Sequence, residues 1–129
     1  MSAELLPDTC AWVDFFRGKS TPLAVAVEQA LRDGTVITCG VILCELIQGI
    51  KNPAEEAAVL NAFAAVPTLE ISSDLWIEAG RLSAQLRSQG QTLPLSDLLI
   101  AVLAKAHGFT VLTIDRHFAQ VTGLRVVGG

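Results

Sequence analysis

The chain lacks the segments that a membrane or secreted protein needs. Although 51 % of its 129 residues are hydrophobic, the longest uninterrupted apolar run is only seven residues, 98–104. A membrane-spanning helix needs about 20 such residues. The first residues, MSAELLPD, contain neither a basic region nor a long apolar stretch, so they do not predict a secretory signal. We therefore expect a cytoplasmic protein with no membrane segment.

Cysteine is scarce and its arrangement excludes two kinds of site. The three cysteines are odd in number and form no C-x-x-C pair, and the two histidines lie far from them in sequence. This pattern predicts neither a disulfide framework nor a zinc site, but reduced thiols that act as small buried hydrophobes. The residues concerned are Cys10, Cys39 and Cys44.

Basic charge and aromatic side chains are also in short supply. The net charge is −4, which argues against general affinity for nucleic acid, and the absence of tyrosine limits base stacking. A nuclease is not excluded, because a bound metal ion offsets the charge of a carboxylate cluster. No G-x-S-x-G, P-loop or G-x-G-x-x-G motif is present.

Helical segments alternate with short strands along one domain that covers residues 1–129. This pattern predicts an α/β fold with a mostly parallel central sheet covered by helices. The predicted strands are 4–7, 35–38, 67–71, 109–114 and 124–127. The predicted helices are 9–18, 22–32, 41–49, 54–65, 72–87, 96–107 and a short one in 115–121. Thr21 and Ser72 are expected to cap two of these helices, and Ser96 a third.

Four acidic residues stand at the ends of these elements. Asp8 and Asp115 each follow a strand, Glu45 lies in an apolar helix that follows a strand, and Asp97 opens the most apolar helix. Sites in parallel sheets form beyond the carboxyl ends of the strands, so the four should converge. Singly, each has a simpler interpretation: Asp8 as a turn residue, Asp115 as a cap, Asp97 as a first-turn acid and Glu45 as a solvated side chain.

Together these carboxylates would suit a hard divalent cation, Mg²⁺ or Mn²⁺. Such a site performs metal-assisted hydrolysis and needs no nucleophilic serine or cysteine.

The order of these motifs resembles the PIN-domain nucleases, most closely the VapC-type toxins of toxin–antitoxin pairs. The matching segments are Asp8-Thr9, Glu45 in TCGVILCELIQG, Asp97 in LPLSDLLIAVLAKAHG and Asp115 in VLTIDRHF. The resemblance implies a Rossmann-like α/β/α sandwich and a Mg²⁺- or Mn²⁺-dependent endoribonuclease. It also implies a VapB-type antitoxin as partner and a homodimer.

By position, the resemblance makes the four acids the catalytic and metal-binding set and Thr9 and Thr113 auxiliary hydroxyls. Two residues depart from the family pattern. Cys10 stands where serine is common, and His117 stands where an acid is common, which weakens the case for a second metal. His117 can also be read as a plain surface histidine or as a contact to phosphate.

Basic residues that flank the predicted edge are candidates for RNA contact. Arg116 comes first because it adjoins Asp115, and Arg17 comes next; Lys19 and Arg87 are further candidates. Apolar surface for a partner is expected at Trp12, Phe15 and Phe16 and at 54–66, and Trp76 is expected in the core or at an interface.

Three functions remain open at this point. The first is a ribonuclease toxin, and the second is an inactive PIN-like module that only binds protein or RNA. The third is a different metal phosphohydrolase, or a nuclease that acts in RNA maturation or on DNA. The presence of all four acids favours the first.

Overall fold

The computed structural model describes residues 4–129, so Met1 to Ala3, which belong to the segment examined for a signal, lie outside the described residues. In chain order its elements are β1 (Leu5–Pro7), α1 (Thr9–Phe16), α2 (Pro22–Asp33), β2 (Thr38–Cys39), α3 (Gly40–Gln48), α4 (Pro53–Phe63), β3 (Thr68–Leu69), α5 (Ser73–Ser88), α6 (Leu95–His107), β4 (Thr110–Leu112), the 3₁₀ helix η1 (Arg116–Gln120) and β5 (Arg125–Val127).

All strand pairs in the described chain are parallel. One sheet has the order β1-β4-β5 and a second the order β2-β3. A parallel bridge between Leu5 and Val36 joins them, with Leu5 N donating to Thr35 O at 2.8 Å and Ile37 N to Leu5 O at 2.9 Å. The predicted parallel α/β architecture is confirmed, and the carboxyl ends of β1 and β4 lie side by side.

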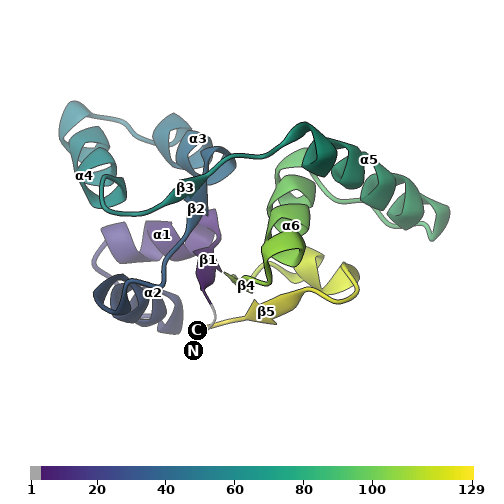
Figure 1. Cartoon of the computed structure of the whole chain (residues 1–129). Helices are drawn as coiled ribbons and strands as arrows, with labels where there is room; N and C mark the ends of the chain where they lie inside the picture. Colours follow the sequence, from purple (N-terminus) through teal and green to yellow (C-terminus); the bar gives the residue numbers. More distant parts are fainter. Residues whose placement is uncertain (1–3) are drawn as a thin grey trace.

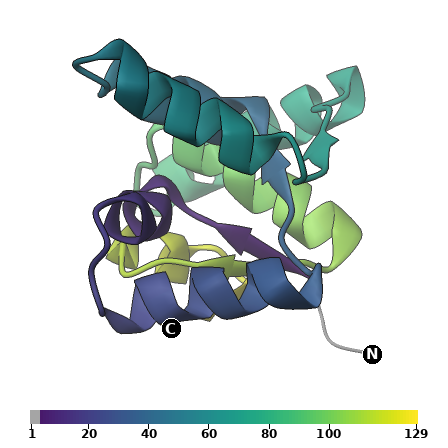
Figure 2. The same cartoon turned by 90° about the vertical axis from the view of Figure 1, so that its left-hand side faces the viewer.

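Helices lie on both sides of these strands. Figure 1 shows α1 and α2 on one side of β1 and α5 and α6 on the other. Figure 2, a quarter turn away, shows α4 at the top of the molecule and α2 at the bottom.

The helix boundaries follow local chemistry. Thr21 Oγ1 accepts from Ala24 N at 3.2 Å and starts α2, and Gly34 ends it with φ +70°, a conformation that side chains disfavour. Ser72 Oγ accepts from Leu75 N at 3.3 Å and starts α5. Both predicted caps are confirmed.

Helix α6 begins earlier than predicted. Pro94 occupies the cap position without a side-chain hydrogen bond, so Ser96 is not the cap and lies in the first turn. Proline suits this boundary because its ring fixes φ, here −58°. Residues 97–104 are all buried, as the apolar run predicts, and α6 therefore holds Asp97 rigidly at its start.

The two tryptophans lie in different surroundings, one buried and one exposed. Trp12 is fully buried, and its ring lies 4.6 Å from that of Phe63 and 5.8 Å from that of Phe16. It therefore belongs to the core, because an apolar helix face packs inward, and only the half-buried Phe15 and Phe16 reach the surface. Trp76 lies on α5 and is 49 % exposed, so it is not in the core, and the alternative of an interface position stays a prediction.

The cysteines also divide by position. Cys39 is buried, and burial raises the pKa of its thiol, as expected for an inert small hydrophobe. Cys10 is half-buried and Cys44 is exposed, so the prediction of three buried thiols is wrong for these two. Helix α3 presents Cys44 outward, since one helix cannot bury all its faces at a sheet edge.

Candidate active site

Asp8 lies where β1 ends and α1 begins, and it is 7 % exposed. Its Oδ1 accepts from Thr9 N at 2.8 Å, which satisfies a free amide at the helix start. Its Oδ2 accepts from the Thr113 hydroxyl at 2.8 Å. Thr113 follows β4, the neighbour of β1, so parallel pairing brings together two residues that are 105 positions apart.

The Thr113 hydroxyl also fixes a second acid. It accepts from Asp115 N at 2.9 Å while it donates to Asp8. One buried hydroxyl thus orients the Asp8 carboxylate and the backbone that carries Asp115. The position predicted for this residue is confirmed.

Thr9 connects Glu45 to the same group. The Thr9 hydroxyl donates to Glu45 Oε1 at 2.7 Å across the contact between α1 and α3. Glu45 is half-buried, on the side of α3 that faces α1. Each of the two threonines therefore holds one carboxylate, and α1 and α3 are positioned by the strands that precede them.

Asp97 and Asp115 approach one another from α6 and η1. Ligand atoms of these acids and of His117 all lie within 4.8 Å of one another. His117 Nδ1 is 3.5 Å from Asp97 Oδ2 and 3.3 Å from Asp115 Oδ1. The interpretation of His117 as a plain surface residue is therefore incomplete: its side chain is half exposed but faces the acids.

Burial and mutual repulsion disfavour the charged form of these acids. Burial, then the charges of Asp8 and Asp115, raise the pKa of Asp97 to about 6, although His117 opposes the rise. Burial also raises the pKa of Asp8; hydrogen bonds from Thr113 and Thr9 oppose this, and the charges of Glu45 and Asp115 add to it. Four carboxylates from separate segments thus share one electrostatic environment, as predicted.

Apart from His117, no basic side chain in residues 4–129 pairs with this group. Among residues 4–129, no lysine or arginine nitrogen lies within 4.0 Å of an oxygen of the four acids. Buried negative charges without a counter-charge are costly, and a divalent cation would supply one. The donor set of carboxylate oxygens with one imidazole therefore fits a divalent metal ion.

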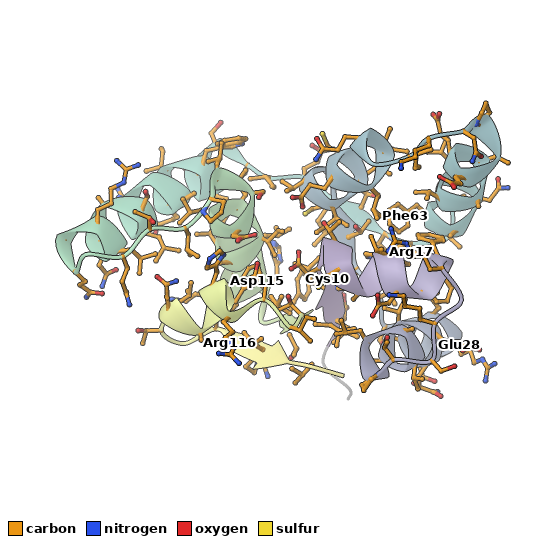
Figure 3. All side chains as sticks on the ribbon, turned by 180° about the vertical axis from the view of Figure 1, so that it is seen from behind. Cys10, Arg17, Glu28, Phe63, Asp115 and Arg116 are labelled. Carbon is orange, nitrogen blue, oxygen red and sulfur yellow. The ribbon has the colours of Figure 1, made fainter. Side chains whose placement is uncertain are left out.

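The predicted basic residues lie at different places. Arg116 is exposed on η1 directly after Asp115, whereas Arg17 is at the other end of α1 from Cys10 (Figure 3). A cavity of about 430 Å³ nevertheless has both Arg17 and Glu45 in its lining. Lys19 pairs with Asp14 at 3.7 Å, and Arg87 lines a separate hollow beside Trp76.

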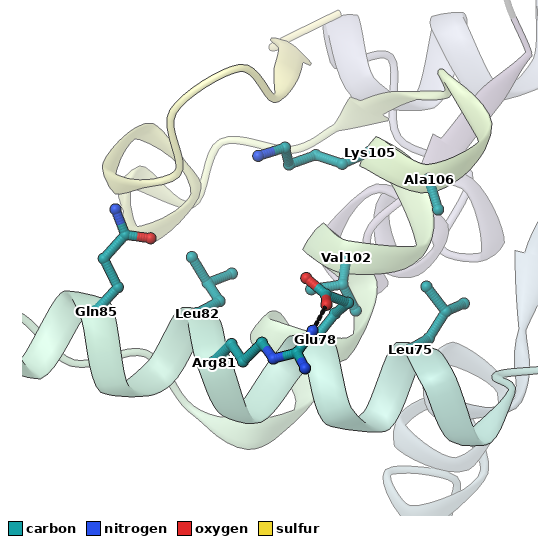
Figure 4. A pocket seen from close by; sticks show the side chains of 8 residues that line it. All are labelled: Leu75, Glu78, Arg81, Leu82, Gln85, Val102, Lys105 and Ala106. Carbon is teal, nitrogen blue, oxygen red and sulfur yellow. Dashed lines mark hydrogen bonds and ion pairs between the residues drawn. The ribbon is translucent and has the colours of Figure 1, made fainter.

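A further hollow, of about 360 Å³, lies between α5 and α6 (Figure 4). Its lining includes Glu78, Arg81 and Lys105 but none of the four acids. Glu78 pairs with Arg81 across one turn, so its charge is compensated there. The acid group and not this hollow is the candidate active site.

The sequence reasoning missed one contact of the site. Cys10 Sγ lies 3.6 Å from the Thr113 hydroxyl and 3.9 Å from Asp8 Oδ2. The signal was available, because Cys10 is two residues after Asp8 and occupies a serine position of the family pattern.

The PIN domain family profile matches residues 5–124 of the chain. The chain belongs to the PIN domain family. Of its relatives, Ribonuclease VapC11 from Mycobacterium tuberculosis is 28 % identical over 94 % of this PIN domain and 96 % of that protein. The tRNA(fMet)-specific endonuclease VapC from Shigella flexneri is 30 % identical over 85 % of this chain and 87 % of that one.

A solved structure agrees with this assignment at the level of the fold. The DNA-bound VapBC complex from Salmonella typhimurium contains a chain that superposes on this PIN domain with a TM-score of 0.80, covering 98 % of both chains at 23 % identity. The predicted PIN-like fold is thereby confirmed. Of the helices in residues 4–129, none has the length and apolar character needed to span a membrane.

Proposed function

We propose that this PIN domain is a metal-dependent endoribonuclease and the toxin of a toxin–antitoxin pair. The observation that carries the proposal is the convergence of Asp8, Glu45, Asp97 and Asp115 with no lysine or arginine partner in residues 4–129. Relatives named as VapC ribonucleases that match nearly the whole chain support RNA as the substrate. An intact set of acids favours an active enzyme over a module that only binds.

The four acids and their supporting threonines have defined roles in this proposal. Asp8, Asp97 and Asp115 would hold Mg²⁺ or Mn²⁺, with Glu45 completing the negative group beside Thr9. A divalent ion bound there would lower the pKa of a water molecule and offset charge on the scissile phosphodiester. Thr113 holds Asp8 and the backbone of Asp115 in position, and Thr9 orients Glu45.

The basic residues that would meet the RNA backbone are Arg116 and Arg17. Arg116 adjoins the acid group, and Arg17 lines the cavity that reaches Glu45. Both side chains are exposed, so each can pair with a phosphate at little desolvation cost.

We further propose that a VapB-type antitoxin is the cognate partner of this chain and that the pair works in the cytoplasm. The support is that solved relatives of this fold are VapBC complexes. The exposed apolar residues of the chain provide surface for a partner and for a second copy.

The central test is cleavage of labelled RNA by purified protein, with and without Mn²⁺. The wild type should cleave only with the metal, while Asp8→Asn and Asp97→Asn should lose at least about 100-fold in rate, because each removes a charge that the transition state needs. Glu28→Gln is the matched control, because Glu28 is an exposed acid paired with Arg32 on α2.

Equal cleavage by the wild type and both site variants would exclude this site as the source of activity. Cleavage of DNA but not RNA would replace the ribonuclease by a deoxyribonuclease. The toxin role predicts that expression of the wild type, but not Asp97→Asn, arrests growth of a bacterial host.

A further inference from the structure

Beside the acids, His117 offers a nitrogen atom among oxygen atoms in the described part of the chain. It stands where the family pattern commonly has an acid, and its Nδ1 faces both Asp97 and Asp115 at 3.5 and 3.3 Å. The three residues form a set of two oxygens and one nitrogen within 4.8 Å. An acid at this position would supply a third oxygen.

The backbone holds His117 in this place. Asp115 caps η1, and its Oδ1 accepts from His117 N at 2.9 Å, so the carboxylate that faces the imidazole also fixes its main chain. The next residue, Phe118, is fully buried and anchors η1 in the core. The main chain of His117 is thus held on both sides, which places its imidazole beside Asp97 and Asp115.

The Asp97 carboxylate is buried and only weakly paired within the protein. Asp97 is 8 % exposed, and no donor in residues 4–129 makes a hydrogen bond of ordinary length to its carboxylate; the contact with His117 Nδ1 is 3.5 Å long. A carboxylate this buried needs more compensation than one long contact to an imidazole. A cation between Asp97, Asp115 and His117 would provide it.

We propose that His117 is itself a ligand of the metal ion, through Nδ1, and that it makes this site prefer a divalent transition metal over Mg²⁺. Imidazole binds transition-metal ions well, while Mg²⁺ prefers oxygen ligands and retains its waters. An imidazole nitrogen also adds no negative charge, so the site attracts Mg²⁺ more weakly than it would with an acid at position 117. This inference rests on the proposed metal-dependent function.

The direct test is the electron spin-echo spectrum of the full chain loaded with Mn²⁺, purified without a histidine tag. A bound imidazole should produce modulation from directly coordinated nitrogen. The chain has two histidines, and His107 is exposed at the end of α6, where its ring stacks on Phe109 at 5.1 Å. His117→Ala should therefore abolish the signal, and the matched His107→Ala should retain it.

Calorimetric titration with Mn²⁺ and Mg²⁺ provides the second readout. His117→Ala should lower Mn²⁺ affinity at least about tenfold, as loss of a metal-supporting residue does, and change Mg²⁺ affinity much less. His117→Asp should reverse the preference by raising Mg²⁺ affinity relative to Mn²⁺. Circular dichroism of each variant would confirm that it is folded.

The outcomes separate this inference from the proposed function. If Mn²⁺ binds, Asp97→Asn weakens it and RNA is cleaved, but no nitrogen modulation is seen, then His117 is not a ligand and the nuclease assignment stands. An unchanged Mn²⁺-to-Mg²⁺ affinity ratio in His117→Asp would overturn the inference in the same way. If Mn²⁺ does not bind at all, the metal-dependent function fails together with it.

Discussion

The carboxylate of Asp97 has to ionise in a nearly closed environment that already contains two acids. Its pKa is raised from 3.8 to about 6, mainly by burial and then by Asp8 and Asp115. In the unfolded chain the proton leaves at the ordinary pKa, whereas the folded protein keeps it to higher pH. The folded state therefore loses stability as the pH rises from about 4 through 6.

We expect Asp97→Asn to stabilise the metal-free protein at neutral pH. The rise in the pKa of Asp97 to about 6 corresponds to up to about 3 kcal/mol of unfolding free energy at pH 7, which the neutral amide avoids. Denaturant unfolding in chelator should show this gain at pH 7, a smaller one near pH 5 and almost none near pH 3. A gain of equal size at all three values would show that the ionisation of Asp97 is not its cause.

Helix α2 shows how one cap can serve two elements. Thr21 Oγ1 accepts from Ala24 N at the start of α2 and donates to Asp14 Oδ2 of α1 at 2.8 Å. Ser72 starts α5 with one bond only, to Leu75 N, and is exposed. The first cap ties α2 to the helix that begins at the active site, while the second acts on its own helix.

Thr21→Ala should therefore destabilise the protein more than the matched Ser72→Ala. Loss of an N-cap costs about 0.5–2 kcal/mol, and we expect Thr21 at the upper end because Asp14 also loses a donor. Chemical denaturation measures both values. Since neither residue touches the acid group, RNA cleavage at 25 °C should stay near the wild-type rate. A larger loss for Ser72→Ala would contradict the double role of Thr21.

Three exposed large apolar side chains lie on α5 and the start of α6. Trp76 and Ile77 on α5 are 49 % and 53 % exposed, and Leu95 at the start of α6 is 59 % exposed. Trp76 and Leu95 line one hollow of about 280 Å³. Large apolar side chains grouped in this way are typical of an interface between chains.

We predict that this surface forms the homodimer. Trp76→Glu should shift the protein towards the monomer in sedimentation velocity, because a charge in an apolar interface is costly. Val25→Glu is the control, since Val25 is 56 % exposed on α2, on the other side of β1 from α5 (Figure 1). A wild-type monomer at micromolar concentration, or equal dissociation by both variants, would show that the chains do not pair here.

Much of the architecture was predictable because its signals are local. Thr21-Pro22, Gly34, Ser72 and Gly108 mark helix ends through bonds and dihedral angles within a few residues. The limits of the strands were harder to predict. The strand predicted at 35–38 is observed at Thr38–Cys39, because pairing with β3 and not β-branched composition defines it. Likewise, Pro94 and not Ser96 occupies the cap position of α6, because the surrounding structure sets this boundary.

The candidate site, too, could be predicted only in part from the sequence. That Asp8, Glu45, Asp97 and Asp115 belong together could be inferred from their order, because strand ends in a parallel sheet share an edge. The orientation of His117 towards Asp97, and the burial of Trp12 against Phe63, could not. These contacts join residues at least 20 positions apart, and no local pattern encodes their distance.

The kinds of residue in this chain and their spacing thus specified a parallel α/β fold with acids gathered at one edge. That follows because secondary structure and strand-end chemistry depend on neighbours along the chain. Packing chose which side chains meet: it buried Asp97, raised its pKa and turned an imidazole towards it. Burial and distance are properties of the folded chain as a whole, so the character of this site became visible only in three dimensions.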